Sequence, residues 1–241
     1  MKALLSAVLC LAALPSRAAE DRSLGAVLLL QGRYQEAAAA LDADLKRRPD
    51  DAAALANRCT ARYKLGQYEE AISDFEAAVK LKPDVKPALA PSMSDAYYQR
   101  GLRLVEAGAE DQAAEALYAS VRLDRKNALA YNELGYLALR GKQNETSLDY
   151  FDRAVKLDPD LAPAYANRAA ALLALRRPAQ AFADLDRAVL LSPKTGAFFA
   201  LRARASAALG RRGQALKDAA RAVELDPKQA EAVKEFLPKD K

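Results

Sequence analysis

Apolar residues along most of the chain recur with the spacing of short amphipathic helices that come in pairs. The segment from Ala154 to Ala170 contains the joint between two such helices: an apolar helix end runs into Pro159, and a second apolar helix starts directly afterwards. Copies of this joint recur along the chain. The helix-ending prolines are 34 residues apart in three cases, Pro49 to Pro83, Pro159 to Pro193 and Pro193 to Pro227. A fixed period of this size predicts a stacked array of repeats rather than one closed core.

Small and large apolar residues alternate between the paired helices. Alanines such as Ala71, Ala78 and Ala154 let two helices approach closely, and a large side chain such as Phe75 fills the space between them. Each helix is a short piece whose apolar stripe is buried only by its neighbours, so the stability of the array is summed along it.

The 34-residue unit of helix, tight turn and helix resembles the tetratricopeptide repeat (TPR). Repeat two carries the pattern most completely, with Gly66, Tyr68, Ala71, Phe75, Ala78 and Pro83 at the expected places. The other repeats keep most of these residues, with Arg125 in place of the proline in repeat three and Pro178 and Arg212 in place of the turn tyrosine in repeats five and six. The resemblance covers roughly residues 19 to 229. It implies an all-α, right-handed superhelical solenoid of about six repeats with a C-terminal capping helix, and a protein that binds other proteins.

The array is divided by one irregular segment. Residues 86–93 are eight extra residues, in which Pro87 and Pro91 are expected to interrupt helix. They separate repeats one and two (residues 19–85) from repeats three to six (residues 94–229), either as a tolerated loop or as a hinge or partner-specific feature. Residues 230–241 are expected to form a capping helix, from Ala230 to Phe236, and a charged tail.

The N-terminal segment differs from the repeats. Lys2 precedes an apolar run from Ala3 to Leu14, and small residues at Ser16 and Ala18 follow. This pattern is typical of a secretory signal peptide over residues 1–18, and the run is shorter than the ~20 residues of a spanning helix. We therefore expect an exported protein in the periplasm of a Gram-negative cell. The alternative is an N-terminal helix of the array.

The composition argues against catalysis and against metal or cofactor binding. The chain has no histidine, and Cys59 is its only cysteine outside the N-terminal apolar run, which holds Cys10. The usual nucleophile–base pairs and zinc or copper clusters therefore cannot be assembled, and no glycine-rich phosphate loop is present. We expect no enzyme, no cofactor and no metal, and we expect Cys59 to be a small buried apolar residue.

The first helix of each pair in TPR proteins lines a concave groove, and this resemblance implies a binding surface here. Its expected residues are Asn57, Tyr63, Tyr98, Gln99, Asn132, Tyr136, Asn167 and Arg204. Amides can donate to and accept from the backbone of an extended peptide, and tyrosine offers apolar area with a polar tip. Small residues such as Ala166 and Ala170 leave room for a chain. The alternative is an ordinary solvated surface.

Basic residues gather at the turns within repeats four to six. The expected basic edge comprises Arg140, Lys142, Arg176, Arg177, Arg211 and Arg212. It could meet acidic protein or an anionic surface such as a membrane, or its charges could simply cap helix C-termini. Nucleic acid is not expected, because no basic helix or aromatic platform accompanies the arginines. The main hypothesis is therefore an exported scaffold that binds a protein or peptide in the groove. The alternative is a structural subunit that docks through its convex face or the basic edge.

Overall fold

The computed structural model describes residues 23–237, and all the regular structure within this range is helical. The expected signal peptide, residues 1–18, lies outside the described residues. Six successive helix pairs confirm the all-α array that the 34-residue period predicts. They fall into two compact units that divide after Arg125, and each unit is described by itself. The expected boundaries around residues 86–93 stay a prediction.

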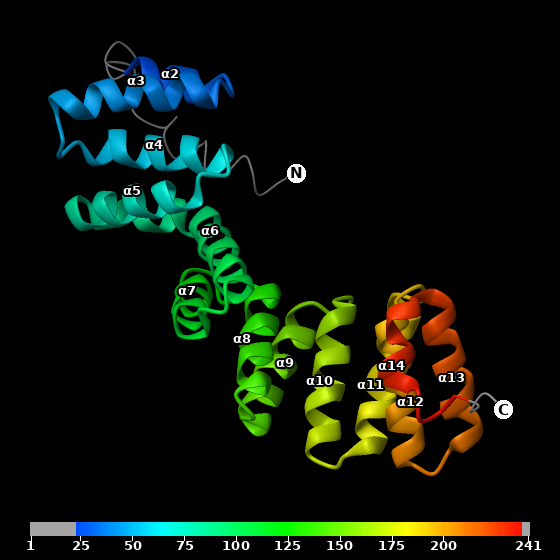
Figure 1. The fold of residues 1–241 in the computed structure, drawn as a ribbon. Helices are drawn as coiled ribbons and strands as arrows, with labels where there is room; N and C mark the ends of the chain where they lie inside the picture. Colours follow the sequence, from blue (N-terminus) through cyan, green and yellow to red (C-terminus); the bar gives the residue numbers. More distant parts are fainter. Residues whose placement is uncertain (1–22, 238–241) are drawn as a thin grey trace. The chain divides into compact units, whose positions relative to one another are not determined.

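Unit 1 holds three helix pairs, and in each pair the second helix packs on the first (Figure 1). We call the first and second helix of a pair the A helix and the B helix. The A helices are α2 (Leu24–Leu30), α4 (Ala52–Lys64) and α6 (Lys86–Glu106), and the B helices are α3 (Tyr34–Arg47), α5 (Tyr68–Leu81) and α7 (Glu110–Leu123). A single turn of 3₁₀ helix, η1 (Pro83–Val85), leads from α5 into α6.

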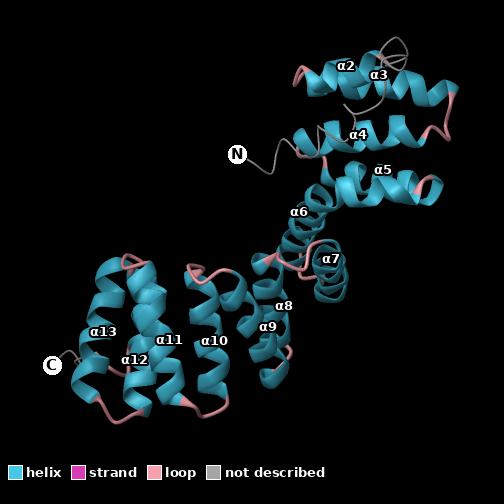
Figure 2. Cartoon of the chain, turned by 180° about the vertical axis from the view of Figure 1, so that it is seen from behind, coloured by secondary structure: helices cyan, strands magenta, loops and turns pink. Residues whose placement is uncertain are grey.

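Unit 2 repeats the arrangement with three more pairs. Its A helices are α8 (Ala128–Arg140), α10 (Ala162–Ala174) and α12 (Gly196–Ala208), and its B helices are α9 (Asn144–Leu157), α11 (Pro178–Leu191) and α13 (Arg212–Leu225). The A helices stand side by side on one side of the unit and the B helices lie on the other, as the front and back views show (Figures 1 and 2).

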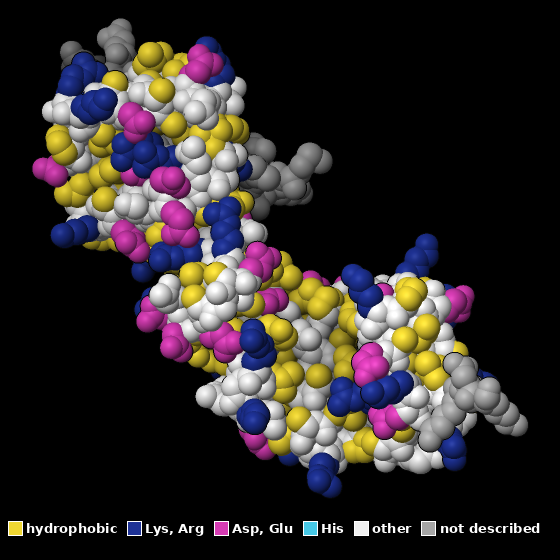
Figure 3. All heavy atoms as spheres, in the orientation of Figure 1, with side chains coloured by type: hydrophobic (Ala, Val, Ile, Leu, Met, Phe, Trp, Pro, Cys, Tyr) yellow, Lys and Arg dark blue, Asp and Glu magenta, His cyan; other side chains and the backbone are white. Residues whose placement is uncertain are grey.

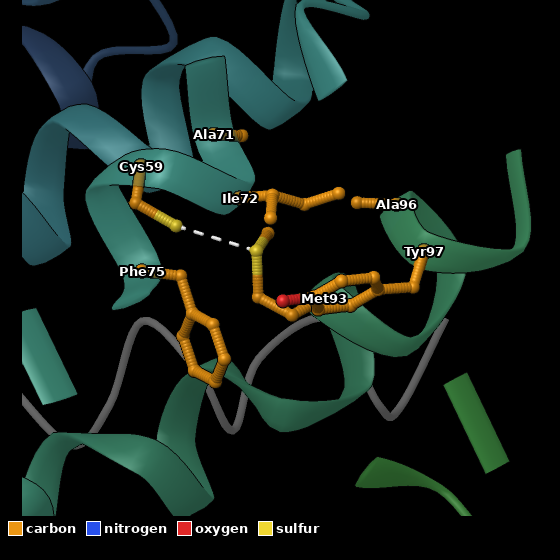
Figure 4. Close-up of a cluster of buried hydrophobic side chains, with 7 residues drawn as sticks. All are labelled: Cys59, Ala71, Ile72, Phe75, Met93, Ala96 and Tyr97. Atoms are coloured by element: carbon orange, nitrogen blue, oxygen red, sulfur yellow. Dashed lines mark hydrogen bonds between the residues drawn. The ribbon is translucent and has the colours of Figure 1, made fainter. Parts of the chain in front are cut away.

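The small-to-large packing predicted from the sequence is visible where the two helices of a pair cross. Gly135 of α8 lies under the ring of Phe151 of α9, so close that a Cβ atom there would sit 2.6 Å from Phe151 Cε1. Cys59 takes the equivalent place in α4. Its Sγ lies 3.5 Å from Met93 Sδ in a cluster with Phe75 and Tyr97 (Figure 4). The expectation of a small buried residue at Cys59 is therefore confirmed, with the side chain 0% exposed.

The expectation that Pro87 and Pro91 interrupt helix is wrong, because α6 runs without a break through 21 residues and includes both. Pro87 lies in the first turn, where a helix needs no backbone N–H from it. Pro91 removes the hydrogen bond to the carbonyl of Pro87, which is an exposed residue at the start of the helix. The added turns are held in place by packing, since Met93 is fully buried and Leu89 packs on the same cluster.

The C-terminal cap is shorter than predicted. Helix α14 covers only Ala230–Val233, after the 3₁₀ turn η2 (Pro227–Gln229), and the chain continues in tight turns to Leu237. Pro238 follows in the sequence and disfavours helix at the residue before it. The segment nevertheless covers the last pair, because Val233 is fully buried and Phe236 and Leu237 pack against the cluster of α12 and α13.

Candidate functional site

The candidate site is the A-helix face of unit 2, which we define as the outward surface of α8, α10 and α12. Figure 3 shows hydrophobic side chains gathered over α8 and α10 on this face, with lysine and arginine side chains around them. Leu129 and Tyr136 of α8 are 44% and 37% exposed, although both are large apolar side chains. An exposed apolar area of this kind, bordered by polar groups, is typical of an interaction surface.

A chain of hydrogen bonds connects the amides of this face. Asn167 of α10 donates from Nδ2 to Asn132 Oδ1 of α8 (3.0 Å), and Asn132 donates from Nδ2 to Glu133 Oε1 (3.0 Å). Asn132 is buried and Asn167 is half-buried. The two predicted amides therefore come together, but part of their hydrogen-bonding capacity is used within the face. Glu133 is not among the residues predicted from the sequence, although it occupies the position in its repeat that Asn167 occupies 34 residues later.

The other predicted residues of this face differ in their exposure. Arg204 of α12 is exposed, and Ala170 between it and Tyr136 is half-buried. Ala166 lies below the surface, 2% exposed, so it acts as a packing residue of the core. The face thus presents a tyrosine and an arginine on either side of a helix whose side chains are small.

The residues predicted for binding on the A helices of unit 1 are mostly buried or hydrogen-bonded. Asn57 and Tyr98 are buried, at 6% and 9% exposure, and Gln99 is half-buried. Tyr63 donates its hydroxyl hydrogen to Asp95 Oδ2 (3.0 Å), and burial is the main cause that raises the pKa of Tyr63 to about 12. Two of the four predicted residues therefore offer a partner little surface, and a third is already bonded. The part of these residues in binding stays a prediction.

The predicted basic residues all lie at the turns between the A and B helices of unit 2, where their side chains are exposed. Lys142 and Arg176 adopt left-handed backbone conformations, with φ of 60° and 57°. The same position in the other four repeats is a glycine with positive φ, as at Gly210. Arg140 lies over the ring of Tyr136, 5.9 Å from its centroid, so one residue of the edge also borders the A-helix face.

A repeated arginine network was not anticipated from the sequence. In repeat five, Arg168 of α10 donates to both carboxylate oxygens of Asp184 of α11 (2.8 and 2.6 Å) and to Asp152 of α9 (2.7 Å). One arginine thus joins its own B helix to the preceding one. The same triad occurs twice more, as Arg58 with Asp74 and Asp42 and as Arg202 with Asp218 and Asp186. The signal in the sequence was a pair of aspartates placed 16 residues on either side of an arginine.

No group of acidic or cysteine side chains within residues 23–237 has the arrangement of a metal site. Burial raises the pKa of the Cys59 thiol to about 12, so this cysteine is no reactive thiolate. None of the helices described here combines the length and apolar character that a membrane crossing requires.

Comparisons with known proteins agree with this architecture. Two models of the tetratricopeptide repeat match, one over residues 52–85 and one over residues 98–162. No curated protein matches the chain. Solved structures share the fold at low sequence identity, and we describe three of them.

YrrB, described as a TPR protein with an unusual peptide-binding site, has a TM-score of 0.62 at 19% identity over 82% of this chain and 98% of its own. The C-terminal part of a TPR repeat-containing protein from Cytophaga hutchinsonii has a TM-score of 0.60 at 17% identity over 88% and 83%. The protein MamA has a TM-score of 0.55 at 20% identity over 75% and 94%. At these identities the structures establish the fold alone. The two matching repeat models show that this chain contains tetratricopeptide repeats, and six helix pairs of this kind follow one another in the described residues.

Proposed function

We propose that this TPR protein is a scaffold that binds an extended segment of a partner protein on the A-helix face of unit 2. TPR arrays are protein-interaction scaffolds, and the finer proposal concerns the place and the mode of binding. The observation that carries it is the exposed ring of Tyr136 beside the hydrogen-bonded amides of Asn132 and Asn167.

The geometry of the face suits an extended chain. Tyr136 provides a large contact area at a small entropic cost, because its side chain has only two rotatable bonds. Asn167 keeps its carbonyl oxygen and one amide hydrogen, which can accept from and donate to a peptide backbone. Ala170 places only a methyl group between Tyr136 and Arg204, so a backbone can lie close to α10. The description of YrrB, whose fold is similar, names an unusual peptide-binding site, and this supports a peptide as the kind of partner.

The test is a double variant, Tyr136→Ala with Asn167→Ala, in a binding assay against a partner identified by affinity purification from the cell envelope. We expect binding to weaken by about 2 kcal/mol, as the loss of two central contacts does. Circular dichroism should show an unchanged helix content. Photo-crosslinkers in place of Ala170 and of Arg212 locate the partner independently, and we expect the partner to be trapped only from position 170.

A second candidate function is docking through the basic edge. The backbone at Lys142 and Arg176 favours it, because a left-handed conformation costs a side-chain-bearing residue about 1 kcal/mol that a glycine would avoid. Charge reversal at Arg176, Arg177, Arg211 and Arg212 tests this candidate. If this charge reversal abolishes binding while Tyr136→Ala with Asn167→Ala binds normally, the partner docks on the basic edge. The proposal of binding on the A-helix face is then wrong.

We also propose that the protein is exported and acts in the cell envelope, on the evidence of the apolar run and the small residues in the first 18 positions. Cleavage after Ala18 would leave a mature chain that begins at Ala19. N-terminal sequencing of the protein from the envelope fraction tests this. An intact Met1 on protein from the cytosol would refute it.

A further inference from the structure

The buried acidic side chains of this protein have arginine partners, and this pattern makes Glu133 an exception. Asp74, Asp184 and Asp218 are 3%, 8% and 3% exposed, and each is gripped through both carboxylate oxygens by an arginine of the neighbouring A helix. Taking a carboxylate out of water costs free energy unless a cation or several donors compensate it.

Glu133 is half-buried, and among the described residues its carboxylate makes no ion pair. Its hydrogen bond comes from the Nδ2 atom of Asn132, which engages only Oε1. A carboxylate can accept about four hydrogen bonds, so Oε2 and part of Oε1 remain available. Burial raises the pKa of Glu133, which is the expected response of an acid that lacks a cation.

We propose that Glu133 is the specificity-determining residue of the A-helix face and that it receives a lysine or arginine side chain of the bound partner segment. This inference rests on the proposed function, and it adds the chemistry of the partner. The bound cation would form an ion pair with Glu133, as Arg168 does with Asp184.

The position of Glu133 supports this assignment. In the other repeats of unit 2, the same place in the A helix holds Asn167 and Leu201, so only α8 brings an acid there. Asn132 is buried and is itself held by Asn167, so the hydrogen bond from Asn132 fixes the carboxylate relative to α10. A carboxylate that is already oriented loses little entropy when a cation binds it.

The neighbours of Glu133 suit the stem of a long cationic side chain. Leu129 and Tyr136 lie one turn before and about one turn after Glu133 on α8, and both are exposed apolar surfaces. Lysine and arginine bury their methylene groups on such surfaces while the charged end reaches an acid. The nearest cation on the helix is Arg140, two turns away and placed over the ring of Tyr136, so it does not neutralise Glu133.

The experiment uses the full chain and a library of nine-residue peptides in which one position is fixed as lysine, arginine, glutamine, norleucine or glutamate. Fluorescence anisotropy then gives the dissociation constant of the tightest cationic peptide and of its glutamine counterpart. Both are measured with the unaltered chain, with Glu133→Gln and with a control, Glu145→Gln, which makes the same change at an exposed residue of α9. Glutamine can still accept the hydrogen bond of Asn132, so the fold should be preserved.

We expect the unaltered chain and Glu145→Gln to prefer the cationic peptide by about 10-fold to 100-fold, as charge-assisted hydrogen bonds do. In Glu133→Gln the preference should fall to within about threefold. If Glu133→Gln keeps the full preference, or if the peptides bind without any preference for a cation, the assignment of Glu133 is overturned while the groove proposal stands. If no peptide binds, or if Tyr136→Ala with Asn167→Ala leaves peptide binding unchanged, the proposed function itself fails and the inference with it. Self-association of the chain that Glu133→Gln abolishes would show a second copy as the occupant, and this too would overturn the proposal.

Discussion

Replacing Arg168 by leucine removes the cation that joins two B helices in repeat five. Asp184, which is 8% exposed in the unaltered chain, then has no arginine on its two carboxylate oxygens, whereas the side chain of Asp152 is 62% exposed and can be hydrated. Loss of one partner of a buried pair costs about 3 to 5 kcal/mol, and loss of an exposed pair costs less than about 1 kcal/mol. Because the side chain of Arg168 is itself 20% exposed, we expect the lower end, a loss of about 3 kcal/mol in the free energy of unfolding.

Repeat four has no ion pair at the places that Arg168 and Asp184 occupy in repeat five. In repeat four, 34 residues earlier, Leu134 and Tyr150 occupy the places of Arg168 and Asp184. Leu134 is 2% exposed, and the ring of Tyr150 stacks on that of Tyr131 with centroids 6.4 Å apart. The double variant Arg168→Leu with Asp184→Tyr should therefore recover stability to within about 1 kcal/mol of the unaltered chain, since an apolar pair can replace a buried ion pair.

Urea unfolding followed by far-ultraviolet circular dichroism measures these differences. The matched control is Arg187→Leu, which breaks an ion pair with Asp160 whose side chains are 40% and 81% exposed, and it should cost less than about 1 kcal/mol. Equal losses for Arg168→Leu and Arg187→Leu would show that burial of the pair does not set the energy. A double variant less stable than Arg168→Leu alone would refute the argument that the unpaired Asp184 causes the loss.

Four further predictions follow from single residues. Arg176→Gly should stabilise the chain by about 0.5 kcal/mol, because the relief of the left-handed backbone exceeds the added entropy of the unfolded chain. Thermal unfolding measures this change, and a lower melting temperature would contradict it. Gly135→Ala should destabilise the chain by about 2 kcal/mol in the same assay, since the new methyl group overlaps the Phe151 ring. An unchanged stability would mean that the ring moves freely. Burial raises the pKa of Glu133, so the folded state binds its proton more tightly than the unfolded state. Its contribution to stability therefore falls as the pH rises above about 4.3, and the melting temperature of Glu133→Gln should increasingly exceed that of the unaltered chain; a difference independent of pH would contradict this. Cys59, fully buried with a pKa of about 12, should react with a thiol reagent only after unfolding, so rapid labelling of the native chain would refute its burial.

The sequence by itself determined the repeat architecture of this protein. The 34-residue spacing of prolines such as Pro159 and Pro193 predicts where the repeats end, and the alternation of small and large residues such as Ala71 and Phe75 predicts close packing inside each pair. These features are readable because each repeat packs mainly on itself and on its neighbours, so the same local rule recurs along the chain.

Only the tertiary structure decided how side chains of successive repeats share their partners. Asn132 is buried, Glu133 has no cationic partner among the described residues, and Arg168 lies between two aspartates, whereas the sequence marks all of these as polar residues of amphipathic helices. Helix α6 also continues through Pro91, because the packing of Met93 outweighs one lost hydrogen bond. The physical reason is that burial and ion pairing depend on how neighbouring helices are rotated and spaced, which the period of a sequence does not encode.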